Sequence, residues 1–187
     1  MYLGRYRDAD VWADRARRTF QRTGDRLRLA RLEVNAGNLL FRQDRFEEAL
    51  RAYRRAFQVF QRQGQAQDAA IALRNMAVCH TNLNAFSQAF RTYARARAYG
   101  VSHGFALFVA EVDYNVAYVH YLRGEYGRAI SLYRETRLAC QTVGDRYHEA
   151  LCDLDQAEMF LDLNMATEAS DLAMSALGRF TALSMAY

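Results

Sequence analysis

The sequence contains no proline and no lysine among its 187 residues. Because proline interrupts helices and is common in flexible linkers, its absence favours uninterrupted helices over disordered segments. Every basic side chain is an arginine, which we attribute to genome composition. Selection of arginine for bidentate contacts with carboxylates or phosphates is the alternative interpretation.

Cysteine is scarce and long apolar runs are missing. The three cysteines, Cys79, Cys140 and Cys152, form no C-x-x-C motif and leave an odd count, which predicts small core residues in a reducing compartment. No apolar run approaches the roughly 20 residues that span a bilayer. The opening MYLGRYRDAD is polar from its fourth residue and lacks the apolar stretch of a signal peptide. These absences predict a soluble, cytoplasmic protein.

Motifs for catalysis are also absent. The sequence has no Gly-rich phosphate loop, no H-E-x-x-H and no nucleophile elbow. His80 and His120 are forty residues apart, but no third ligand recurs with them. The pair is therefore predicted to be packed and half-buried rather than a zinc site. We expect no enzymatic activity, no metal and no cofactor.

The feature that the sequence does contain is a period of forty residues. Glycine keeps this interval at Gly24, Gly64, Gly104 and Gly144. Aromatic residues keep it at Tyr6, Phe46, Phe86 and Tyr126, and alanine keeps it at Ala9, Ala49, Ala89, Ala129 and Ala169. No insertion interrupts the register. A fixed period in this range is typical of stacked-repeat proteins, which bind other molecules more often than they catalyse reactions.

Each unit of forty residues is predicted to form two helices. In residues 26–64, apolar residues at helical spacing run up to Asp44, resume at Phe46 and end at Gly64. The break falls on residue types that tolerate a positive φ in all four units: Asp44, Asn84, Gly124 and Asn164. This pattern predicts nine helices, near residues 5–23, 26–43, 46–63, 66–83, 86–103, 106–123, 126–143, 146–163 and 166–183.

The nine helices are expected to form one domain over residues 1–187. A partial repeat at about 1–24 precedes full repeats at 25–64, 65–104, 105–144 and 145–184. Because the helix number is odd and no polar capping helix closes the array, we expect a fragment of a longer protein. Its exposed ends would allow a homodimer.

The forty-residue unit resembles the tetratricopeptide repeat family. The family pattern has a small residue in the first helix, an aromatic residue after the turn, and alanine, aromatic and alanine in the second helix. One copy supplies Gly37, Phe46, Ala49, Tyr53 and Ala56, and the next supplies Ala77, Phe86, Ala89, Tyr93 and Ala96. The family's tryptophan in the first helix is replaced by Glu33, Leu73, Asp113 and Asp153.

The resemblance implies an all-α, right-handed α-solenoid of about four and a half repeats. The longer unit with a terminal glycine is similar to repeats in kinesin light chains, in LGN-type polarity scaffolds and in bacterial signalling proteins. Some of the bacterial arrays precede a regulator, an NTPase or a CHAT protease domain. The implied function is a scaffold for protein–protein interaction that binds an extended peptide segment in a concave groove lined by the first helices.

The candidate binding residues lie on the side of the first helices opposite their packed stripe. They are Asn35, Asn38, Arg42, Arg74, Asn75, Asn82, Tyr114, Asn115, Tyr118, Tyr121, Asp155 and Glu158. The amides of Asn35, Asn75 and Asn115 share one repeat position and could grip a peptide backbone, or alternatively bond to the neighbouring helix. The arginines suit a carboxylate or phosphate and the acidic residues a basic segment. The tyrosines either anchor the ligand or pack against the next repeat.

The net charge of +4 conceals a gradient along the chain. Residues 1–64 carry 15 arginines against 8 acidic residues (+7), residues 65–125 carry +1, and residues 126–187 carry −4. Nucleic-acid binding through Arg15, Arg18, Arg22 and the arginines of residues 51–62 is an alternative function. It is disfavoured because Asp8, Asp10, Asp14, Glu47 and Glu48 interleave with these arginines. A structural spacer or self-association module is the other alternative.

Overall fold

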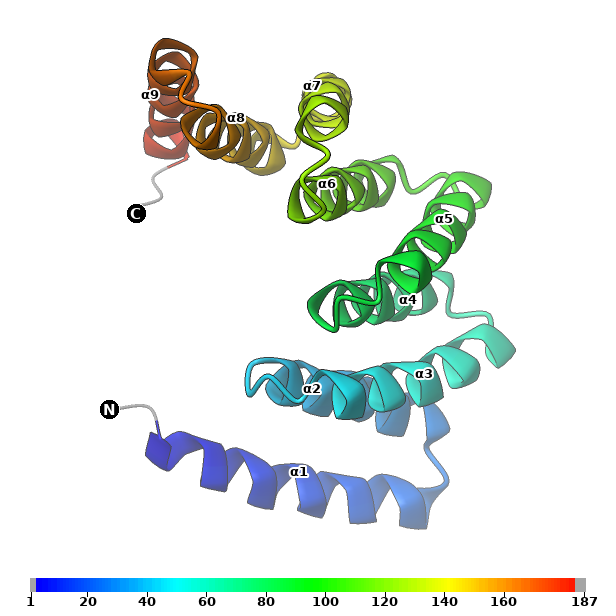
Figure 1. Ribbon diagram of the computed structural model, residues 1–187. Coiled ribbons are helices and arrows are strands. Elements are labelled where there is room, and N and C mark those ends of the chain that lie inside the picture. The colour runs from blue at the N-terminus through cyan, green and yellow to red at the C-terminus, as the bar shows by residue number, and fades with distance from the viewer. Residues whose placement is uncertain (1–2, 184–187) are drawn as a thin grey trace. The chain divides into compact units, whose positions relative to one another are not determined.

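In a computed structural model of the chain, the backbone is described for residues 3–183 and the side chains for residues 11–183. These residues form nine α-helices and no strand (Figure 1). The helices are α1 (Leu3–Thr23), α2 (Arg26–Phe41), α3 (Phe46–Arg62), α4 (Ala66–Asn82), α5 (Phe86–Ser102), α6 (Ala106–Leu122), α7 (Tyr126–Val143), α8 (Arg146–Asp162) and α9 (Ala166–Ala182). The predicted all-α helical solenoid is confirmed, and each helix lies where the period predicts it.

The turns explain why helices begin and end at these positions. Asp44, Asn84, Gly124 and Asn164 have φ angles of 58°, 54°, 71° and 59°, so the predicted positive φ is confirmed at all four. Gly64 and its equivalents also have positive φ, which glycine adopts without steric cost. The Asp25 and Asp145 carboxylates accept hydrogen bonds from the backbone N–H groups of Arg28 and His148 and cap α2 and α8.

The chain divides into two compact units, Met1–Arg95 (unit 1) and Ala96–Tyr187 (unit 2), with the boundary inside α5. We call α2, α4, α6 and α8 the A helices and the other five the B helices. In unit 1, α1 packs on α2, α2 on α3 and α3 on α4, and the A helices α2 and α4 also touch. In unit 2, α6, α7, α8 and α9 pack in the same sequence, and α6 touches α8. The expectation of a single domain over residues 1–187 stays a prediction.

Small residues and tyrosines make the core of each unit. In unit 1, Ala49, Ala56 and Tyr53 of α3 are buried. A Cβ atom on Gly37 of α2 would lie 2.7 Å from Cε1 of Tyr53, so glycine lets the two helices approach. In unit 2, Tyr133 occupies the position equivalent to Tyr53 and is fully buried. The small and aromatic positions of the repeat are therefore packing positions.

Pairs of side chains sixteen residues apart connect each B helix to the following A helix. The Arg17 and Glu33 side chains are 3.5 Å apart, and the Arg97–Asp113 and Arg137–Asp153 ion pairs are 2.8 and 2.7 Å. The second repeat replaces the charged pair with Phe57 and Leu73, both buried. The residues at the family's tryptophan position are thus used in contacts between helices.

Candidate functional site

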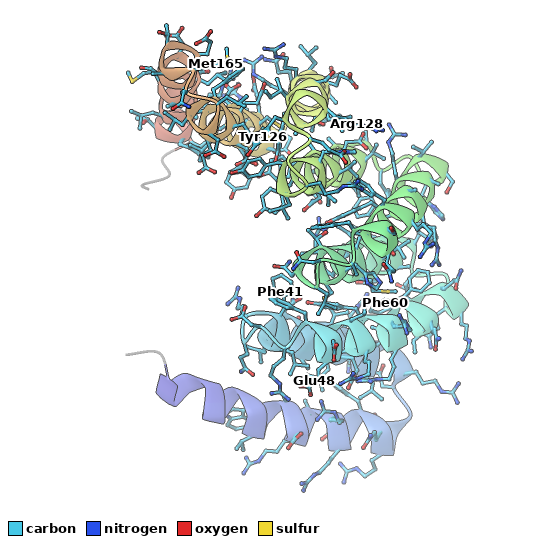
Figure 2. All side chains as sticks on the ribbon, in the orientation of Figure 1. Phe41, Glu48, Phe60, Tyr126, Arg128 and Met165 are labelled. Atoms are coloured by element: carbon cyan, nitrogen blue, oxygen red, sulfur yellow. The ribbon has the colours of Figure 1, made fainter. Side chains whose placement is uncertain are left out.

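Three helices of unit 1 enclose a small groove that gathers several predicted site residues. The groove has a volume of about 240 Å³ and is lined by Asn38, Phe41, Arg42, Tyr53, Asn75 and Val78. Asn38, Phe41 and Arg42 come from the end of α2, with Phe41 labelled in Figure 2. Asn75 and Val78 come from α4, and Tyr53 forms the floor from α3. We call this set the polar groove.

The polar groove presents hydrogen-bond donors. The Tyr53 hydroxyl donates to Oδ1 of Asn38 over 2.7 Å, which leaves both N–H groups of the Asn38 amide for a ligand. Burial raises the pKa of Tyr53, so its phenol keeps the proton that it donates. Among the described residues, no partner binds the Arg42 guanidinium or the Asn75 amide. Such a set of donors suits a carboxylate or a peptide carbonyl oxygen.

Other predicted residues of unit 1 lie outside the lining of the groove. Asn35 is exposed on α2, one turn before Asn38. Arg74 is half-buried on α4 next to Asn75. Asn82 is exposed at the end of α4, where its Nδ2 donates to the Val78 carbonyl over 2.9 Å. Asn35 and Arg74 thus extend the polar surface, whereas the Asn82 amide is partly used by its own helix.

The A helices of unit 2 carry a face of tyrosines and carboxylates. The hydroxyls of Tyr114 and Tyr133 both donate to Oδ2 of Asp155, over 2.7 and 2.8 Å. The Tyr121 hydroxyl donates to Oδ2 of Asp162 over 3.0 Å. Tyr114 and Tyr121 lie on α6, and both carboxylates lie on α8. These bonds hold neighbouring A helices together and occupy several groups that were predicted to contact a ligand.

The exposed part of this face is smaller than predicted. Tyr118 is 40% exposed, and its ring centroid lies 6.1 Å from that of Tyr121. Glu158 is exposed, and its pKa is raised by partial burial and by the carboxylates of Asp155 and Asp162. Burial raises the pKa of Asp155, against the opposing effect of the two tyrosine hydrogen bonds. Tyr118 and Glu158 are therefore the predicted residues of unit 2 that remain open to a partner.

The asparagine column differs between the units. Asn75 in unit 1 has no partner among the described residues, whereas Nδ2 of Asn115 in unit 2 donates to the Glu111 carbonyl over 2.6 Å. Asp155 occupies the equivalent position in the last repeat and binds two tyrosines. Equivalence in the repeat therefore does not make these side chains equivalent in hydrogen bonding.

The two equivalent histidines have separate local contacts. His120 is buried, with Nδ1 2.5 Å from Oε2 of Glu125. His80 is half-buried, and its pKa is lowered by burial and then by the charges of Arg54 and Arg91. Residues 11–183 contain no group of three or more His, Cys, Asp or Glu side chains that could hold a metal ion. No helix in the described part is long and apolar enough to cross a membrane.

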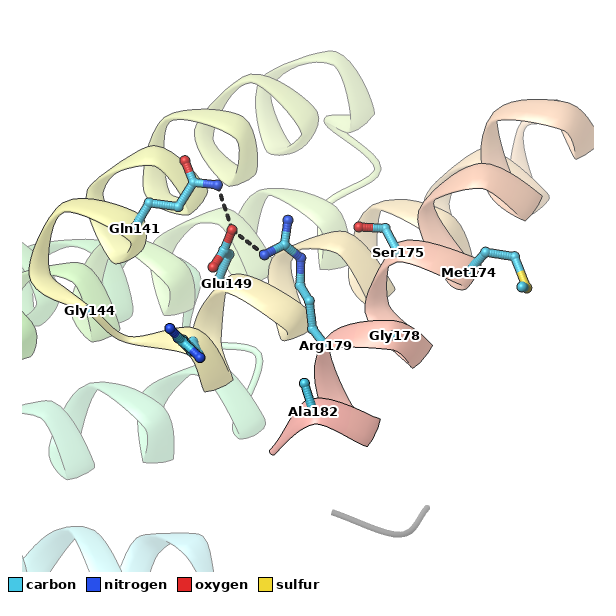
Figure 3. Close-up of a pocket in the computed structure, with 9 residues that line it drawn as sticks. Gln141, Gly144, Glu149, Met174, Ser175, Gly178, Arg179 and Ala182 are labelled. Carbon is cyan, nitrogen blue, oxygen red and sulfur yellow. Dashed lines mark hydrogen bonds and ion pairs between the residues drawn. The ribbon is translucent and has the colours of Figure 1, made fainter. Parts of the chain in front are cut away.

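A charged groove that sequence reasoning missed lies between the B helices α7 and α9. It has a volume of about 700 Å³, and its lining includes Gln141, Arg146, Glu149 and Arg179 (Figure 3). Glu149 is buried, accepts a hydrogen bond from Nε2 of Gln141 and pairs with Nη1 of Arg179. The signal in the sequence was Asp153 at the family's tryptophan position, because Asp153 joins the same network through Arg137 and Arg179.

The equivalent groove one repeat earlier is mainly apolar, and the paired side chains of Arg97 and Asp113 are the charged part of its lining. Val101, Phe105, Val109 and Val143 contribute to its lining, and its volume is about 500 Å³. Val109 occupies the position of Glu149, and Val101 that of Gln141. The repeat thus keeps the shape of this surface and changes its chemistry.

Comparison with known proteins identifies the repeat. The sequence model of a family described as tetratricopeptide repeat matches residues 1–62 and 28–99, which together are more than half of the chain. No curated protein sequence matches the chain.

Solved structures of similar fold include BtubC (BKLC) from P. vanneervenii, with a TM-score of 0.68 and 17% identity over 85% of this chain and 66% of that protein. The Rap conjugation gene regulator of plasmid pLS20, in complex with the Phr* peptide, has a TM-score of 0.78 and 11% identity over 98% of this chain and 51% of the regulator. A Rap protein complexed with competence and sporulation factor has a TM-score of 0.70 and 12% identity, with coverages of 96% and 53%. The chain thus spans about half of each Rap protein and under two thirds of the first protein named here. Identities this low show similarity of fold alone.

Proposed function

The chain belongs to the tetratricopeptide repeat family, and we propose on this basis that it is a protein-interaction scaffold that binds an extended peptide segment of a partner along its A helices. The observation that carries the proposal is the polar groove, where Arg42, Asn38 and Asn75 supply donors that no described residue occupies. The complex of the Rap conjugation gene regulator, which has a similar fold, with the Phr* peptide supports a peptide as the class of ligand.

The polar groove is proposed to bind a carboxylate or carbonyl oxygen of the partner. A guanidinium and two amides can hold an oxygen atom from several sides, and hydrogen bonds to a charged group contribute about 1.5–3 kcal/mol each. Phe41 and Val78 add apolar surface beside these donors. Asn35 and Arg74 extend the donors along α2 and α4, and Asn82 lies at the end of α4. The groove would thus prefer an acidic or C-terminal residue next to an apolar one.

The tyrosine–carboxylate face of unit 2 is proposed to bind a different part of the partner. Tyr118 offers an exposed ring, and Glu158 offers a carboxylate, so a basic side chain is the favoured contact. Tyr114, Tyr121 and Asp155 position these two residues through the bonds between α6 and α8, and Asn115 supports α6 from within. This face offers a ligand fewer open polar groups than the polar groove does, because Tyr114, Tyr121 and Asp155 are already hydrogen-bonded.

Two further elements belong to this proposal. We take the scaffold to be cytoplasmic and to have no catalytic activity of its own. Self-association through α1 and α9 is the alternative function, supported by exposed apolar residues on these helices, Trp12 on α1 and Met174 and Leu177 on α9.

Selection from displayed random peptides tests the groove. The chain is used as bait, and the affinity of a selected peptide is measured by fluorescence anisotropy for the wild type, for the Arg42→Gln/Asn75→Ala variant and for Asn115→Ala. Asn115 is a matched control because it shares the repeat position of Asn75 but is bonded to its own helix. We expect the double substitution to weaken binding about tenfold or more, as follows from the loss of hydrogen bonds to a charged group.

Asn115→Ala is expected to leave the affinity within about twofold of the wild type, because the amide that it removes is already bonded. Thermal unfolding followed by circular dichroism checks that all variants keep the helical fold. Equal affinities of the wild type and the Arg42→Gln/Asn75→Ala variant would exclude the polar groove as the binding site. Enrichment of no peptide, together with dimers in light scattering, would favour self-association.

A further inference from the structure

The outer side of unit 1 presents a row of exposed arginines on two B helices. On α3, Arg51, Arg54 and Arg62 lie on the face opposite the buried Ala49, Tyr53 and Ala56. On α5, Arg91 and Arg95 are exposed in the same way, and both belong to unit 1. Arg51 and Arg91 share one repeat position. We call these five residues, Arg51, Arg54, Arg62, Arg91 and Arg95, the arginine face.

Four carboxylates of unit 1 pair with arginines that do not belong to the arginine face. Glu33 accepts from Nη2 of Arg55 over 2.5 Å, Glu48 binds Arg45 at 2.7 Å, Asp14 binds Arg17 at 2.6 Å, and Asp68 binds Arg31 at 2.8 Å. The five members of the arginine face have no hydrogen bond or ion pair with any described residue. Of the interleaved acids that disfavoured nucleic-acid binding, Asp14 and Glu48 form their ion pairs with arginines outside this face. The pKa of Glu48 is lowered mainly by its hydrogen bond with Arg45 and to a smaller extent by the charge of Arg51. Asp8 and Asp10, the other acids in that argument, lie outside the described side chains, and Glu47 is one turn before Arg51.

One arginine from each helix of the arginine face affects the pKa of the same histidine. Arg54 from α3 and Arg91 from α5 both lower the pKa of His80 on α4, after the larger effect of burial. Arg54 and Arg91 therefore both contribute positive potential at His80. The whole of unit 1 carries 18 arginines against nine acidic residues, a formal net charge of +9. The arginine face thus belongs to the unit with the larger positive charge.

We propose that the arginine face binds the phosphate backbone of a double-stranded nucleic acid. Guanidinium groups bind phosphate oxygens in a bidentate manner, and arginines that neutralise several phosphates of a duplex supply much of the affinity of such complexes. The exposed residues between the arginines include Gln58, Ser87, Gln88 and Ala94, and none of these can stack on a base. Single-stranded binding sites usually have aromatic stacking surfaces, so the duplex backbone is the better match. Recognition would be independent of sequence.

This surface is separate from the proposed peptide site. The polar groove is formed by the end of α2 and by Asn75 and Val78 within α4, whereas the arginine face belongs to the exposed sides of α3 and α5. Peptide binding and duplex binding would therefore be independent properties of unit 1, and either could fail without the other.

Fluorescence anisotropy with a labelled random-sequence DNA duplex and the RNA duplex of the same sequence tests the proposal across a salt series. The test variant is Arg51→Gln/Arg54→Gln/Arg91→Gln/Arg95→Gln. The control is Arg128→Gln/Arg134→Gln, which removes two exposed arginines of α7 that have no hydrogen bond or ion pair with the side chains of residues 11–183. Arg128 is labelled in Figure 2. We expect the affinity of the wild type to fall steeply with salt, with a slope of roughly −0.9 for each neutralised phosphate. The test variant should lose about 3 to 4 units of that slope and the control almost none.

The titration of His80, followed by NMR, is a second and local measurement. Bound phosphates offset the charges of Arg54 and Arg91, so the pKa of His80 should rise when the duplex is added. The rise should be absent in the test variant and present in the control. Because all the substituted arginines are exposed, circular dichroism should show the same thermal unfolding for all three proteins.

Several results would overturn the proposal. These are no binding at low salt, equal weakening by the test and control variants, or an unchanged His80 titration. Tighter binding of a poly-glutamate peptide than of the duplex would show that the face serves an acidic protein. Salt-sensitive self-association that the test variant abolishes without nucleic acid would show that it binds a second copy of the chain.

Discussion

Units 1 and 2 are built from the same forty-residue repeat but have opposite electrostatic character. Unit 1 carries a formal charge of +9, and unit 2 carries seven arginines against twelve acidic residues, a charge of −5. Asp153, Asp155 and Glu149 of unit 2 are bonded within the unit, whereas the five residues of the arginine face in unit 1 have no hydrogen bond or ion pair with any described residue. The difference shows that the repeat specifies backbone packing and leaves the surface chemistry of each unit free to change.

The pairs of residues sixteen apart, which connect each B helix to the following A helix, show how the repeat accepts a change from charged to apolar side chains. Arg137 and Asp153 in unit 2 form an ion pair at 2.7 Å, and the equivalent Phe57 and Leu73 in unit 1 are both apolar and buried. A mixed pair would leave a buried charge without a partner, which is costly. The two positions therefore change together, and the interface accepts either a charged or an apolar pair.

The largest change in the free energy of unfolding is expected when one residue of such an ion pair is replaced by an apolar residue. Asp153→Leu removes the carboxylate that binds Arg137 and Arg179 in the buried network of unit 2. Because removing one partner of a buried ion pair leaves the other uncompensated, the free energy of unfolding should fall by about 3–5 kcal/mol. Adding Arg137→Phe recreates the pair of unit 1 and should recover part of this loss. Urea unfolding followed by circular dichroism measures both values.

Asp113→Leu serves as the control for that experiment. Asp113 is at the same repeat position and binds Arg97, but its side chain is 26% exposed compared with 1% for Asp153. Its loss should cost about 1 kcal/mol or less, as for other partly exposed ion pairs. If Asp153→Leu were no more harmful than Asp113→Leu, the network around Asp153 would not be a source of stability.

The sequence predicted the features that depend on local structure. The ends of the helices follow from residues such as Asp44 and Gly64, whose backbone preferences act within one turn. The groups lining the polar groove were also predictable, since Asn38, Arg42 and Asn75 follow from helical spacing and the repeat. The hydrogen bonds that these groups make could not be predicted. Asn75 has no partner in the part of the chain that the structure describes, and Asn115 is bonded to Glu111, because rotamer choice depends on neighbours that the period does not specify.

The choice of ion-pair partners could not be predicted from the sequence either. The acids that interleave with the N-terminal arginines were expected to form exposed pairs with arginines three or four residues away, and Glu48 and Asp14 do so with Arg45 and Arg17. The sequence did not show which arginines would be chosen. Both partners lie outside the exposed row on α3. Which of several arginines within reach of a carboxylate becomes its partner depends on three-dimensional geometry rather than on spacing.

The second prediction uses the buried tyrosine that both units share. Tyr133 donates to the Asp155 carboxylate, and the equivalent Tyr53 donates to the neutral amide of Asn38. At neutral pH, Tyr133→Phe should lower the free energy of unfolding by about 1.5–3 kcal/mol and Tyr53→Phe by about 0.5–1.5 kcal/mol, because bonds to charged groups are stronger. Urea unfolding of both variants measures the difference.

The pH dependence separates the two variants further. Burial raises the pKa of Asp155 in the folded state, so its stabilising contribution is fully present below the unfolded pKa of about 3.9 and is lost as pH rises through the folded value. The tyrosine hydrogen bonds to a protonated, neutral Asp155 are weaker than those to its carboxylate. The cost of Tyr133→Phe should therefore shrink as pH falls through the folded pKa of Asp155, while the cost of Tyr53→Phe stays constant. Parallel pH profiles would contradict this assignment.

The smallest effect is expected at the turn between α6 and α7, where unit 2 has Gly124 and the equivalent turns of unit 1 have Asp44 and Asn84. All three residues have φ between 54° and 71°. Asparagine tolerates this conformation better than other residues with a side chain, and a Cβ on Gly124 would meet no atom within 4 Å. Gly124→Asn should thus cost only a few tenths of a kcal/mol, and Gly124→Ala about 1 kcal/mol. Because both variants place a Cβ in the same open space, a difference in their urea midpoints isolates the backbone preference. Equal costs would mean that the residue type at this turn is not selected by its φ angle.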